Sequence, residues 1–305
     1  MNSPMRSSRT NDPSSSARPA ETSPWRDLLR TARASLGDAN EAFVLAEEAA
    51  HVSRTELVLA LDTVPRASDR ARFQALVERR SRGAPLQHVV GHWGFRRLDL
   101  FVDGRALVPR PETEFTVEVA LAELTRRRSF GEPALVVELG TGSGAIACSL
   151  VAELDSVSVV ATDCSVRALE VAGVNRARLA RNQANRVEFR LGDWYAALDP
   201  SIAGRVDLVV ANPPYIAASE WYDLDPVVRD FDPPEALVAG ETGREAIEKI
   251  LRGASAWLAR DAAVVVEIAP NQAPGAVAFA FECGARDVEV RRDLAGRDRV
   301  VVVRW

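Results

Sequence analysis

The chain has 305 residues, of which 47% are hydrophobic, 27% charged and 6% aromatic, and its formal net charge is −5 at pH 7. This length predicts about two domains and a core that needs no disulfide or structural metal. The net charge disfavours a globally basic nucleic-acid-binding protein. Three scattered cysteines without a CxxC motif disfavour a disulfide framework or a zinc site and favour a reducing cytoplasm. No stretch reaches 18 apolar residues, so we expect no transmembrane helix.

The N-terminal third of the chain divides by composition. Residues 1–24 contain 11 Ser or Pro and no Val, Ile, Leu, Phe, Trp or Tyr, so we expect a disordered tail. Residues 25–85 show helical patterns, including a capping-box pair at Ser53 and Glu56, and predict a small helical bundle. We interpret this bundle as a substrate-binding domain, with a stabilising extension as the alternative. Residues 66–82 carry six arginines against two acidic residues, which suits an acidic partner or simply a solvated helix face.

A change of character follows at residues 86–111, which we interpret as a β-hairpin linker. Its predicted turns lie at Gly91, Gly94 and Asp103-Gly104. Residues 112–305 then alternate helical segments with short apolar runs, which predicts an α/β domain with a parallel sheet covered on both faces. The runs are Leu135–Leu139, Val157–Thr162, Val187–Leu191, Val206–Ala211, Ala263–Ile268, Asp287–Val290 and Val300–Val303.

The first motif with chemical meaning follows the run that ends at Leu139 and opens a predicted helix. Its residues are Glu138, Gly140, Thr141, Gly142, Ser143 and Gly144. Glycines allow a tight turn and a close approach of the backbone to a ligand at the positive end of a helix. The GxGxG spacing is neither the dinucleotide fingerprint nor a P-loop, because no Lys-Ser/Thr pair follows it. A purely structural strand-to-helix turn is the alternative.

Acidic side chains also follow the next two apolar runs. Asp163 comes 19 residues after Gly144, where a carboxylate can accept hydrogen bonds from both hydroxyls of a ribose. Its alternative role is the N-cap of the following helix. Asp193 and Trp194 come after the third run, where an acid and an aromatic ring can hold an adenine. A turn around one buried tryptophan is the alternative there.

The most informative motif is Asn212-Pro213-Pro214-Tyr215, which follows the fourth apolar run. A planar NH2 nitrogen is a poor nucleophile because its lone pair is delocalised, so a methyltransferase must hold it while it becomes tetrahedral. The Asn212 side-chain oxygen and the Pro213 carbonyl can accept its two N–H bonds, and Tyr215 can stack on the planar group. A proline turn that merely ends a strand is the alternative. His88 and His92, four residues apart, have no nearby third ligand, so we expect no metal site.

Taken together, these motifs resemble the bacterial release-factor N5-glutamine methyltransferases, the PrmC/HemK family, over residues 38–305. The resemblance is also carried by residues 82–87, 108–114, 228–233 and 293–299. It implies a helical N-terminal domain, a hairpin and a Rossmann-like class I methyltransferase domain with a seven-stranded sheet, one strand of which is antiparallel. It further implies that S-adenosyl-L-methionine (AdoMet) donates a methyl group to the glutamine amide of the Gly-Gly-Gln motif in peptide-chain release factors.

Site residues are implied by the same resemblance. An acid before the first glycine, here Glu138, is typical of AdoMet methyltransferases. The implied cofactor contacts are Gly140, Gly142, Gly144, Asp163, Trp194 and Asn212, and the implied substrate contacts are Asn212, Pro213, Pro214 and Tyr215. Two positions depart from the family pattern: Ala269 stands where Gly is usual, and Asp232 where Glu is more usual.

Three other functions are alternatives for this sequence. A paralogous enzyme can methylate an amide or amine of another protein or of a small molecule. An N6-adenine methyltransferase uses the same motif on a flipped base, but the net charge and the absence of a large target-recognition domain disfavour a direct nucleic-acid substrate. A non-catalytic AdoMet-binding protein is disfavoured by the intact Asn212 and Tyr215. We expect no membrane partner.

Overall fold

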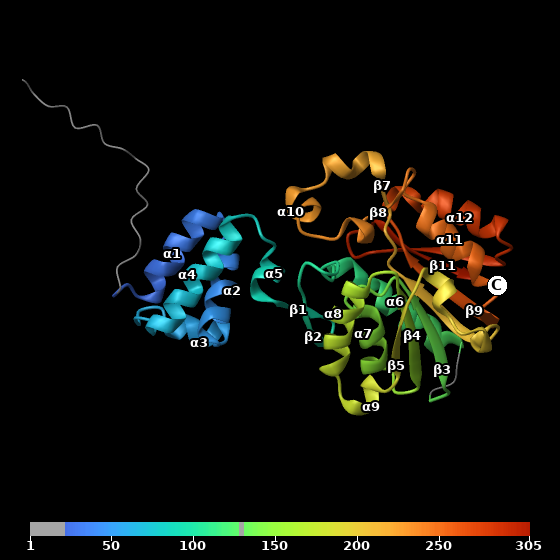
Figure 1. The fold of residues 1–305 in the computed structure, drawn as a ribbon, viewed down its shortest axis with the longest axis horizontal. Helices are drawn as coiled ribbons and strands as arrows, with labels where there is room; N and C mark the ends of the chain where they lie inside the picture. Colours follow the sequence, from blue (N-terminus) through green and yellow to red (C-terminus); the bar gives the residue numbers. More distant parts are fainter. Residues whose placement is uncertain (1–21, 128–130) are drawn as a thin grey trace, which may run out of the picture. The chain divides into compact units, whose positions relative to one another are not determined.

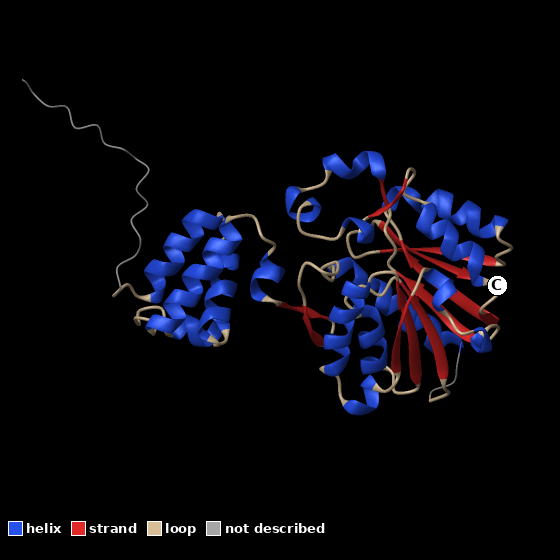
Figure 2. Ribbon diagram, in the orientation of Figure 1, coloured by secondary structure: helices blue, strands red, loops and turns tan. Residues whose placement is uncertain are grey.

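The structure is a computed structural model that describes residues 22–127 and 131–305 (Figures 1 and 2). The chain divides after Gly83 into two compact units. Most of the predicted N-terminal tail, residues 1–21, lies outside the described residues. Within the described residues, no helix is both long and apolar enough to cross a bilayer.

The first unit, described from residue 22 to residue 83, consists of four helices. They are α1 (Trp25–Leu36), α2 (Ala39–Ala50), α3 (Arg54–Leu59) and α4 (Ala67–Ser81). Trp25 of α1 meets Phe73 of α4 edge to face, with ring centroids 5.6 Å apart. The predicted capping box is confirmed: the Ser53 hydroxyl accepts from the Glu56 N–H, and the Glu56 carboxylate accepts from the Ser53 N–H. Each of the four helices buries apolar side chains, and α3 has a capped start.

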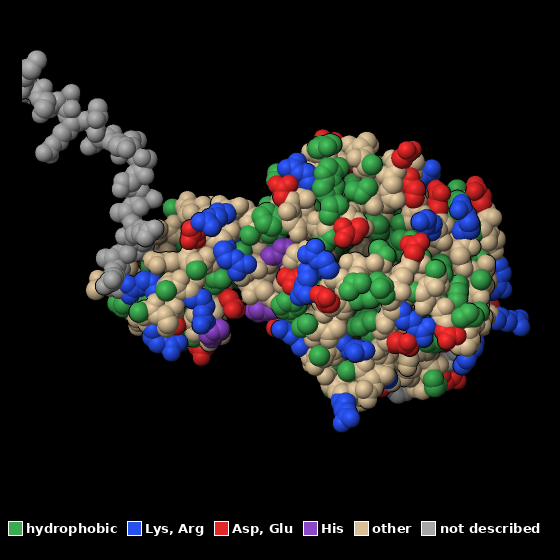
Figure 3. Space-filling view, viewed as in Figure 1, with side chains coloured by type: hydrophobic (Ala, Val, Ile, Leu, Met, Phe, Trp, Pro, Cys, Tyr) green, Lys and Arg blue, Asp and Glu red, His purple; other side chains and the backbone are tan. Residues whose placement is uncertain are grey.

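Ion pairs within the first unit involve several of the arginines in residues 66–82. Arg66 pairs with Asp69 of the same helix at 2.8 Å. Arg80 of α4 pairs with Glu41 of α2 at 2.7 Å, and both side chains are about one-fifth exposed. In the space-filling view, basic side chains of this unit lie beside acidic ones (Figure 3). The arginine-rich segment therefore carries less free positive charge than its sequence suggests, and its role as a partner surface stays a prediction.

A seven-stranded sheet forms the centre of the second unit, as described for residues 84–127 and 131–305. Its strands are β3 (Ala134–Leu139), β4 (Val157–Asp163), β5 (Val187–Leu191), β6 (Val206–Ala211), β9 (Leu258–Glu267), β10 (Asp287–Arg292) and β11 (Asp298–Arg304). They lie in the order β10-β11-β9-β6-β3-β4-β5. Strand β11 is antiparallel to both neighbours, and the other adjacent pairs are parallel. The expected fold class, with one antiparallel strand, is confirmed, and all seven apolar runs form strands of this sheet.

One strand begins earlier than the sequence predicts. The apolar run indicates a start at Ala263, whereas β9 begins at Leu258, which pairs with Val206 of β6. A register shift follows, after which Ala263 pairs with Leu208. Asp261 in this stretch has φ of +59°, so the polar residues before the run form an irregular extension of the strand.

Helices cover both faces of the sheet (Figure 2). The helices of this unit are α5 (Leu86–Val90), α6 (Pro111–Arg127), α7 (Ala145–Glu153), α8 (Val166–Ala177), α9 (Arg181–Ala184), α10 (Pro226–Arg229), α11 (Glu245–Ala254) and α12 (Ala273–Glu282). On β3, Val136 packs with residues of α6 and α7, whereas Val137 packs with residues of α11 and α12. Because successive side chains of a strand point to opposite faces, each strand needs apolar residues at consecutive positions, which explains the continuous runs.

The predicted hairpin is present but is shorter than expected. Its strands are β1 (His92–Phe95) and β2 (Leu98–Phe101), and the preceding residues form α5 instead. The predicted turn at Gly94 is wrong, because Gly94 lies within β1 and pairs with Asp99. The chain turns at Arg96 and Arg97, where Arg96 takes φ of +51°. This conformation is unusual for a residue with a Cβ, so the sequence gives little sign of it.

Asn175 of α8 holds the hairpin against the rest of the second unit. Its Oδ1 accepts the N–H of Phe101 at 2.7 Å, and its Nδ2 donates to the carbonyl of Phe101 at 3.0 Å. The same Nδ2 donates to the carbonyl of Ser143 at 2.9 Å, so one buried amide contacts both the hairpin and the glycine loop. All the hydrogen-bonding capacity of this amide NH2 is used within the protein.

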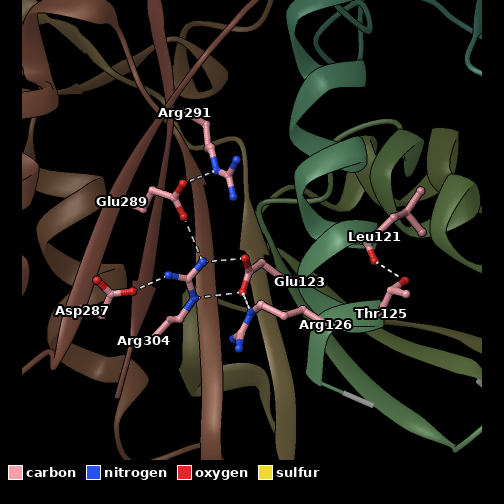
Figure 4. Close-up of polar contacts among 8 residues, drawn as sticks. All are labelled: Leu121, Glu123, Thr125, Arg126, Asp287, Glu289, Arg291 and Arg304. Atoms are coloured by element: carbon pink, nitrogen blue, oxygen red, sulfur yellow. Dashed lines mark hydrogen bonds and ion pairs between the residues drawn. The ribbon is translucent and has the colours of Figure 1, made fainter. Parts of the chain in front are cut away.

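A charge network joins the edge of the sheet to α6 (Figure 4). Arg304, the last residue of β11, donates to Glu123 of α6 at 2.6 Å and to Glu289 of β10 at 3.1 Å, and it also pairs with Asp287. Only 4% of the Glu123 side chain is exposed. Burial raises the pKa of Glu123, but the hydrogen bonds from Arg304 and Arg126 outweigh it and leave the pKa below its usual value.

We expect Arg304→Ala to destabilise the protein by about 3 kcal/mol, because the substitution leaves the Glu123 carboxylate buried without its main partner. Urea unfolding, monitored by tryptophan fluorescence, measures the change in the free energy of unfolding. Arg126→Ala is the matched control, since Arg126 also pairs with Glu123 but its side chain is 51% exposed. The control should lose about 1 kcal/mol or less. Equal losses in the two variants would contradict the interpretation that the buried pair is the important one.

Candidate functional site

A cavity lies at the carboxyl ends of β3, β4, β5 and β6. The strand order reverses here, because β4 and β5 lie on one side of β3 and β6 on the other. Such a switch point leaves a crevice for ligands in open α/β sheets. The cavity measures about 950 Å³ when the space open to solvent is included. Ten of the predicted site residues line it: Glu138, Gly140, Thr141, Gly142, Ser143, Asp163, Asp193, Trp194, Asn212 and Pro214.

Among the loop glycines, Gly144 has a packing role instead. It has φ of +79°, and a Cβ added there would lie 3.2 Å from the Cβ of Ala172 and 3.3 Å from the ring of Phe189. Gly140, at φ of +74°, faces the ring of Trp194 instead. The first glycine of the loop therefore lies at the cavity, whereas the last allows α7 to begin close to α8 and β5.

Glu138 lies beneath the glycine loop and is 1% exposed. Its Oε2 accepts the hydroxyl of Thr141 at 2.7 Å and the N–H of Ala147 at 3.0 Å. Burial raises the pKa of Glu138 to about 8, and the nearby negative charge of Asp163 adds to this. This carboxyl group joins the start of the loop to the start of α7 and fixes the shape of the cavity floor.

The carboxylate of Asp163 lies at the end of β4 and holds the loop from the other side. Its Oδ2 accepts the N–H of Gly142 at 2.8 Å, and its Oδ1 accepts the N–H of Ser165 at 2.9 Å. The alternative role as N-cap is wrong, because Ser165 caps α8 through the N–H of Ala168. Burial raises the pKa of Asp163, against these two hydrogen bonds. A carboxylate has about four acceptor positions, so the two backbone bonds leave capacity for a ligand.

Trp194 and Asp193, which follow β5, also line the cavity. Trp194 adopts φ of +47°, and its ring lies 3.7 Å from where a Cβ on Gly140 would be. The ring therefore lies over the glycine loop. Asp193 is more peripheral: 67% of its side chain is exposed, and it lies 4.0 Å from Lys249.

A second cavity of about 830 Å³ adjoins the predicted substrate motif. Pro213 and Tyr215 line it, together with Arg110, Glu112 and Glu267. Asn212 lines both this cavity and the larger one. Burial raises the pKa of the Tyr215 phenol, so its hydroxyl stays neutral. Asn212 is thus a lining residue common to both cavities.

Several residues that line the two cavities were not predicted from the sequence. Arg110 lines both cavities and donates to Asp232 at 2.5 Å, and Asp232 is 5% exposed. Thr113, at the start of α6, accepts a hydrogen bond from Asn212 Nδ2 at 3.0 Å. The only sequence signal was the segment of residues 108–114, which carried the family resemblance without a role for any one side chain.

In residues 22–127 and 131–305, no group of three or more His, Cys, Asp or Glu side chains is arranged to hold a metal ion. His92, one of the two histidines considered, lies 2.7 Å from Asp99 on the neighbouring strand.

Comparison with known proteins agrees with the fold and the motifs. The PrmC N-terminal domain family matches residues 27–91, and the methyltransferase small domain family matches residues 118–225. The release factor glutamine methyltransferase of Nitratidesulfovibrio vulgaris is 37% identical over 94% of this chain and 97% of its own length. The protein of that name from Rhodopirellula baltica is 34% identical over 86% of this chain and 87% of its own.

The chain belongs to the release factor glutamine methyltransferase family. A further family member, from Streptomyces coelicolor, is 41% identical over 80% of this chain and 84% of its own length. Among solved structures, the hMettl16 catalytic domain in complex with MAT2A 3'UTR hairpin 6 matches with a TM-score of 0.50 and 15% identity. That match covers 75% of this chain and 81% of the other, and supports the methyltransferase fold alone. The glycine loop and the Asn-Pro-Pro-Tyr motif therefore belong to a member of the release factor glutamine methyltransferase family.

The raised pKa of Glu138 gives a pH-dependent prediction. Between an unfolded pKa near 4.5 and a folded pKa of about 8, the folded state holds a proton that the unfolded state releases. Stability therefore falls as pH rises through this window. Glu138→Gln mimics the protonated form, so it should stabilise the protein relative to wild type more at pH 8 than at pH 5. Urea unfolding at both pH values tests this, and a difference that does not change with pH would contradict it.

Proposed function

We propose that this protein transfers the methyl group of AdoMet to the side-chain amide nitrogen of a glutamine, the one in the Gly-Gly-Gln motif of a peptide-chain release factor. The observation that carries the proposal is the position of Asn212, which lines both cavities. One cavity is lined by the glycine loop, Asp163 and Trp194, and the other is lined by residues of the Asn-Pro-Pro-Tyr motif. A group that contacts both can hold an amide nitrogen next to a methyl donor.

The larger cavity suits AdoMet. The free acceptor capacity of Asp163 fits the two ribose hydroxyls, and Trp194 with Asp193 fits the adenine. The glycine loop allows the backbone to approach the amino-acid part of the cofactor closely. AdoMet supplies an electrophilic methyl group on its sulfonium sulfur when bound. Family membership supports this donor as well.

The second cavity suits a planar, uncharged amide. The Asn212 oxygen and the Pro213 carbonyl can each accept one N–H of the substrate amide, and the neutral Tyr215 ring can lie on its planar face. Both acceptors gain strength as positive charge develops on the nitrogen, so they favour the transition state over the ground state. After methyl transfer the nitrogen carries a surplus proton, which is strongly acidic and passes to water. The chain therefore contributes position and acceptors rather than a base.

Two supporting proposals concern the context of the reaction. The helical unit is our proposed binding site for the protein substrate, on the strength of the match of residues 27–91 to the PrmC N-terminal domain. We also propose a cytoplasmic location, which the three free cysteines favour: Cys148, Cys164 and Cys283. The adenine alternative has less support, because the net charge is −5 and acidic and basic side chains are interspersed on the visible face of the second unit (Figure 3).

Mass spectrometry of release-factor peptides after incubation with enzyme and AdoMet is the direct test, with DNA as the competing substrate. We expect one added methyl group on the Gly-Gly-Gln glutamine. Asn212→Ala should lower kcat by about 10²–10³-fold with little change in AdoMet affinity, because the lost contact strengthens in the transition state.

Asn182→Ala, an exposed asparagine of α9 outside both cavities, is the matched control and should behave as wild type. Transfer to DNA instead of the peptide would favour the adenine alternative. An Asn212→Ala enzyme that folds, binds AdoMet and turns over at the wild-type rate would show that the proposed chemistry is wrong.

Asp163→Asn should weaken AdoMet binding by about 10- to 100-fold, because hydrogen bonds from the ribose to a charged acceptor are worth roughly 1.5–3 kcal/mol. Isothermal titration calorimetry measures this. The substitution keeps the size of the side chain and one acceptor oxygen. Asp193→Asn, at a mostly exposed side chain, is the control and should have a smaller effect. Equal affinities of wild type and Asp163→Asn would mean that Asp163 serves only the loop.

A further inference from the structure

The loops that follow β6 and β9 meet at the carboxyl edge of the sheet. Strands β6 and β9 are adjacent and parallel, and Ala211 pairs with Val266. The chain after β6 is the Asn-Pro-Pro-Tyr motif, and the chain after β9 runs into the short helix η5 (Pro270–Gln272). Because parallel strands end at the same edge, the last residue of this helix can reach the main chain at Tyr215. That residue, Gln272, is 8% exposed.

The side-chain amide of Gln272 bonds to the main chain at three places. Its Nε2 donates to the carbonyl of Tyr215 at 3.0 Å and to the carbonyl of Gly243 at 2.8 Å. Its Oε1 accepts the N–H of Ala269 at 3.1 Å. A main-chain N–H only donates and a carbonyl only accepts, so these partners define which end of the amide is the NH2. Both hydrogens of that NH2 are used within the protein.

The peptide unit between Tyr215 and Ile216 is held on both sides. Its carbonyl oxygen accepts the hydrogen bond from Gln272, and its N–H donates to the carbonyl of Leu237 at 3.0 Å. These two bonds fix the plane of the peptide unit and restrict the backbone torsions of Tyr215. The rings of the two prolines before it hold φ near about −65° in both residues. Tyr215 therefore lies between a stiff segment and a fixed peptide plane, which limits the directions open to its ring.

The turn at Gly243 leaves no room for a side chain behind this peptide unit. Gly243 is buried and has φ of +78°. A Cβ added there would lie 2.7 Å from the Tyr215 carbonyl oxygen, 3.1 Å from the Ala217 nitrogen and 3.3 Å from Gln272 Nε2. The first distance is well below van der Waals contact, so a side chain would push apart the groups that Gln272 joins. The close packing of this turn is a second, independent sign that the main chain at Tyr215 has one defined position.

We propose that Gln272 is a positioning residue that fixes the main chain at Tyr215, so that the Tyr215 ring is in place before the substrate amide binds. The proposal rests on the proposed function, in which that ring lies on the planar face of the amide. Gln272 is not a lining residue of the larger cavity, so it acts through the motif and not on the cofactor. A ring held in advance needs no ordering when substrate binds, and small displacements around a reacting centre lower the rate strongly.

The first test compares Gln272→Met with wild type by single-turnover methyl transfer at saturating peptide and by AdoMet calorimetry. Methionine has nearly the same length as glutamine but no N–H to donate, so the variant loses the bonds to both carbonyls without leaving a large void. We expect the rate of methyl transfer to fall by about tenfold or more, because the ring is no longer held in place. AdoMet affinity should stay within about twofold of wild type.

Arg186→Met is the matched control for the loss of side-chain bonds to the main chain. Arg186 donates to the carbonyls of Val151, Leu154 and Val157, beside the start of β4 and outside both cavities. The control should lose stability in urea unfolding and still transfer methyl groups at the wild-type rate.

Coupling to Tyr215 separates positioning from a general loss of structure. In the Tyr215→Ala background there is no ring to position, so adding Gln272→Met should lower the rate little further. An equal loss in both backgrounds, or a wild-type rate for Gln272→Met, would overturn the proposal. If Gln272→Met does not fold, Gly243→Ala takes its place, since its Cβ would displace the Tyr215 carbonyl. It should likewise slow transfer much less where the Tyr215 ring is absent.

The same measurements distinguish this inference from the proposed function. A slow Tyr215→Ala enzyme together with a wild-type rate for Gln272→Met would reject this inference alone. No transfer to glutamine by the wild-type protein would reject the proposed function.

Discussion

The parallel register of β3, β4, β6 and β9 is the constraint on which the site depends. Parallel strands end at the same edge of a sheet, so residues that follow different strands become neighbours without any further device. Asp163 ends β4, Asn212 follows β6 and Glu267 ends β9, and more than 100 residues separate the first from the last. The helices on both faces keep the register fixed, because a slip of one residue would move every side chain of a strand to the opposite face, where it no longer fits its packing partners.

Polarity, more than shape, decides what this edge of the sheet can recognise. The two cavities have lining residues in common, and one of these, Asn212, carries an amide whose ends look alike but bind opposite partners. The cavity walls also depend on α6, because Asn212 Nδ2 donates to Thr113 at the start of that helix.

Much of the fold could be predicted from the sequence, because continuous β-branched runs and glycine at a strand end have few structural interpretations. The glycine loop and Asn212-Pro213-Pro214-Tyr215 were recognisable for the same reason: their chemistry is local. The hydrogen bonds from Asn212 to Thr113 and from Thr116 to Glu267 join positions far apart in the chain and depend on which face of α6 meets β6 and β9, which no local pattern records. The hairpin turn was missed because Arg96, rather than a glycine, adopts the positive φ.

The hydrogen bonds of Asn175 affect how the second unit unfolds. Its NH2 group donates one hydrogen bond to the carbonyl of Phe101 in the hairpin and another to the carbonyl of Ser143 in the glycine loop. Its side-chain oxygen accepts the N–H of Phe101. Because the group is buried, neither partner can leave without stranding a polar atom away from water. We therefore expect the hairpin and the glycine loop to belong to one cooperative unfolding unit. Slow hydrogen exchange at the Phe101 amide would then indicate that the glycine loop, more than 40 residues away, is folded.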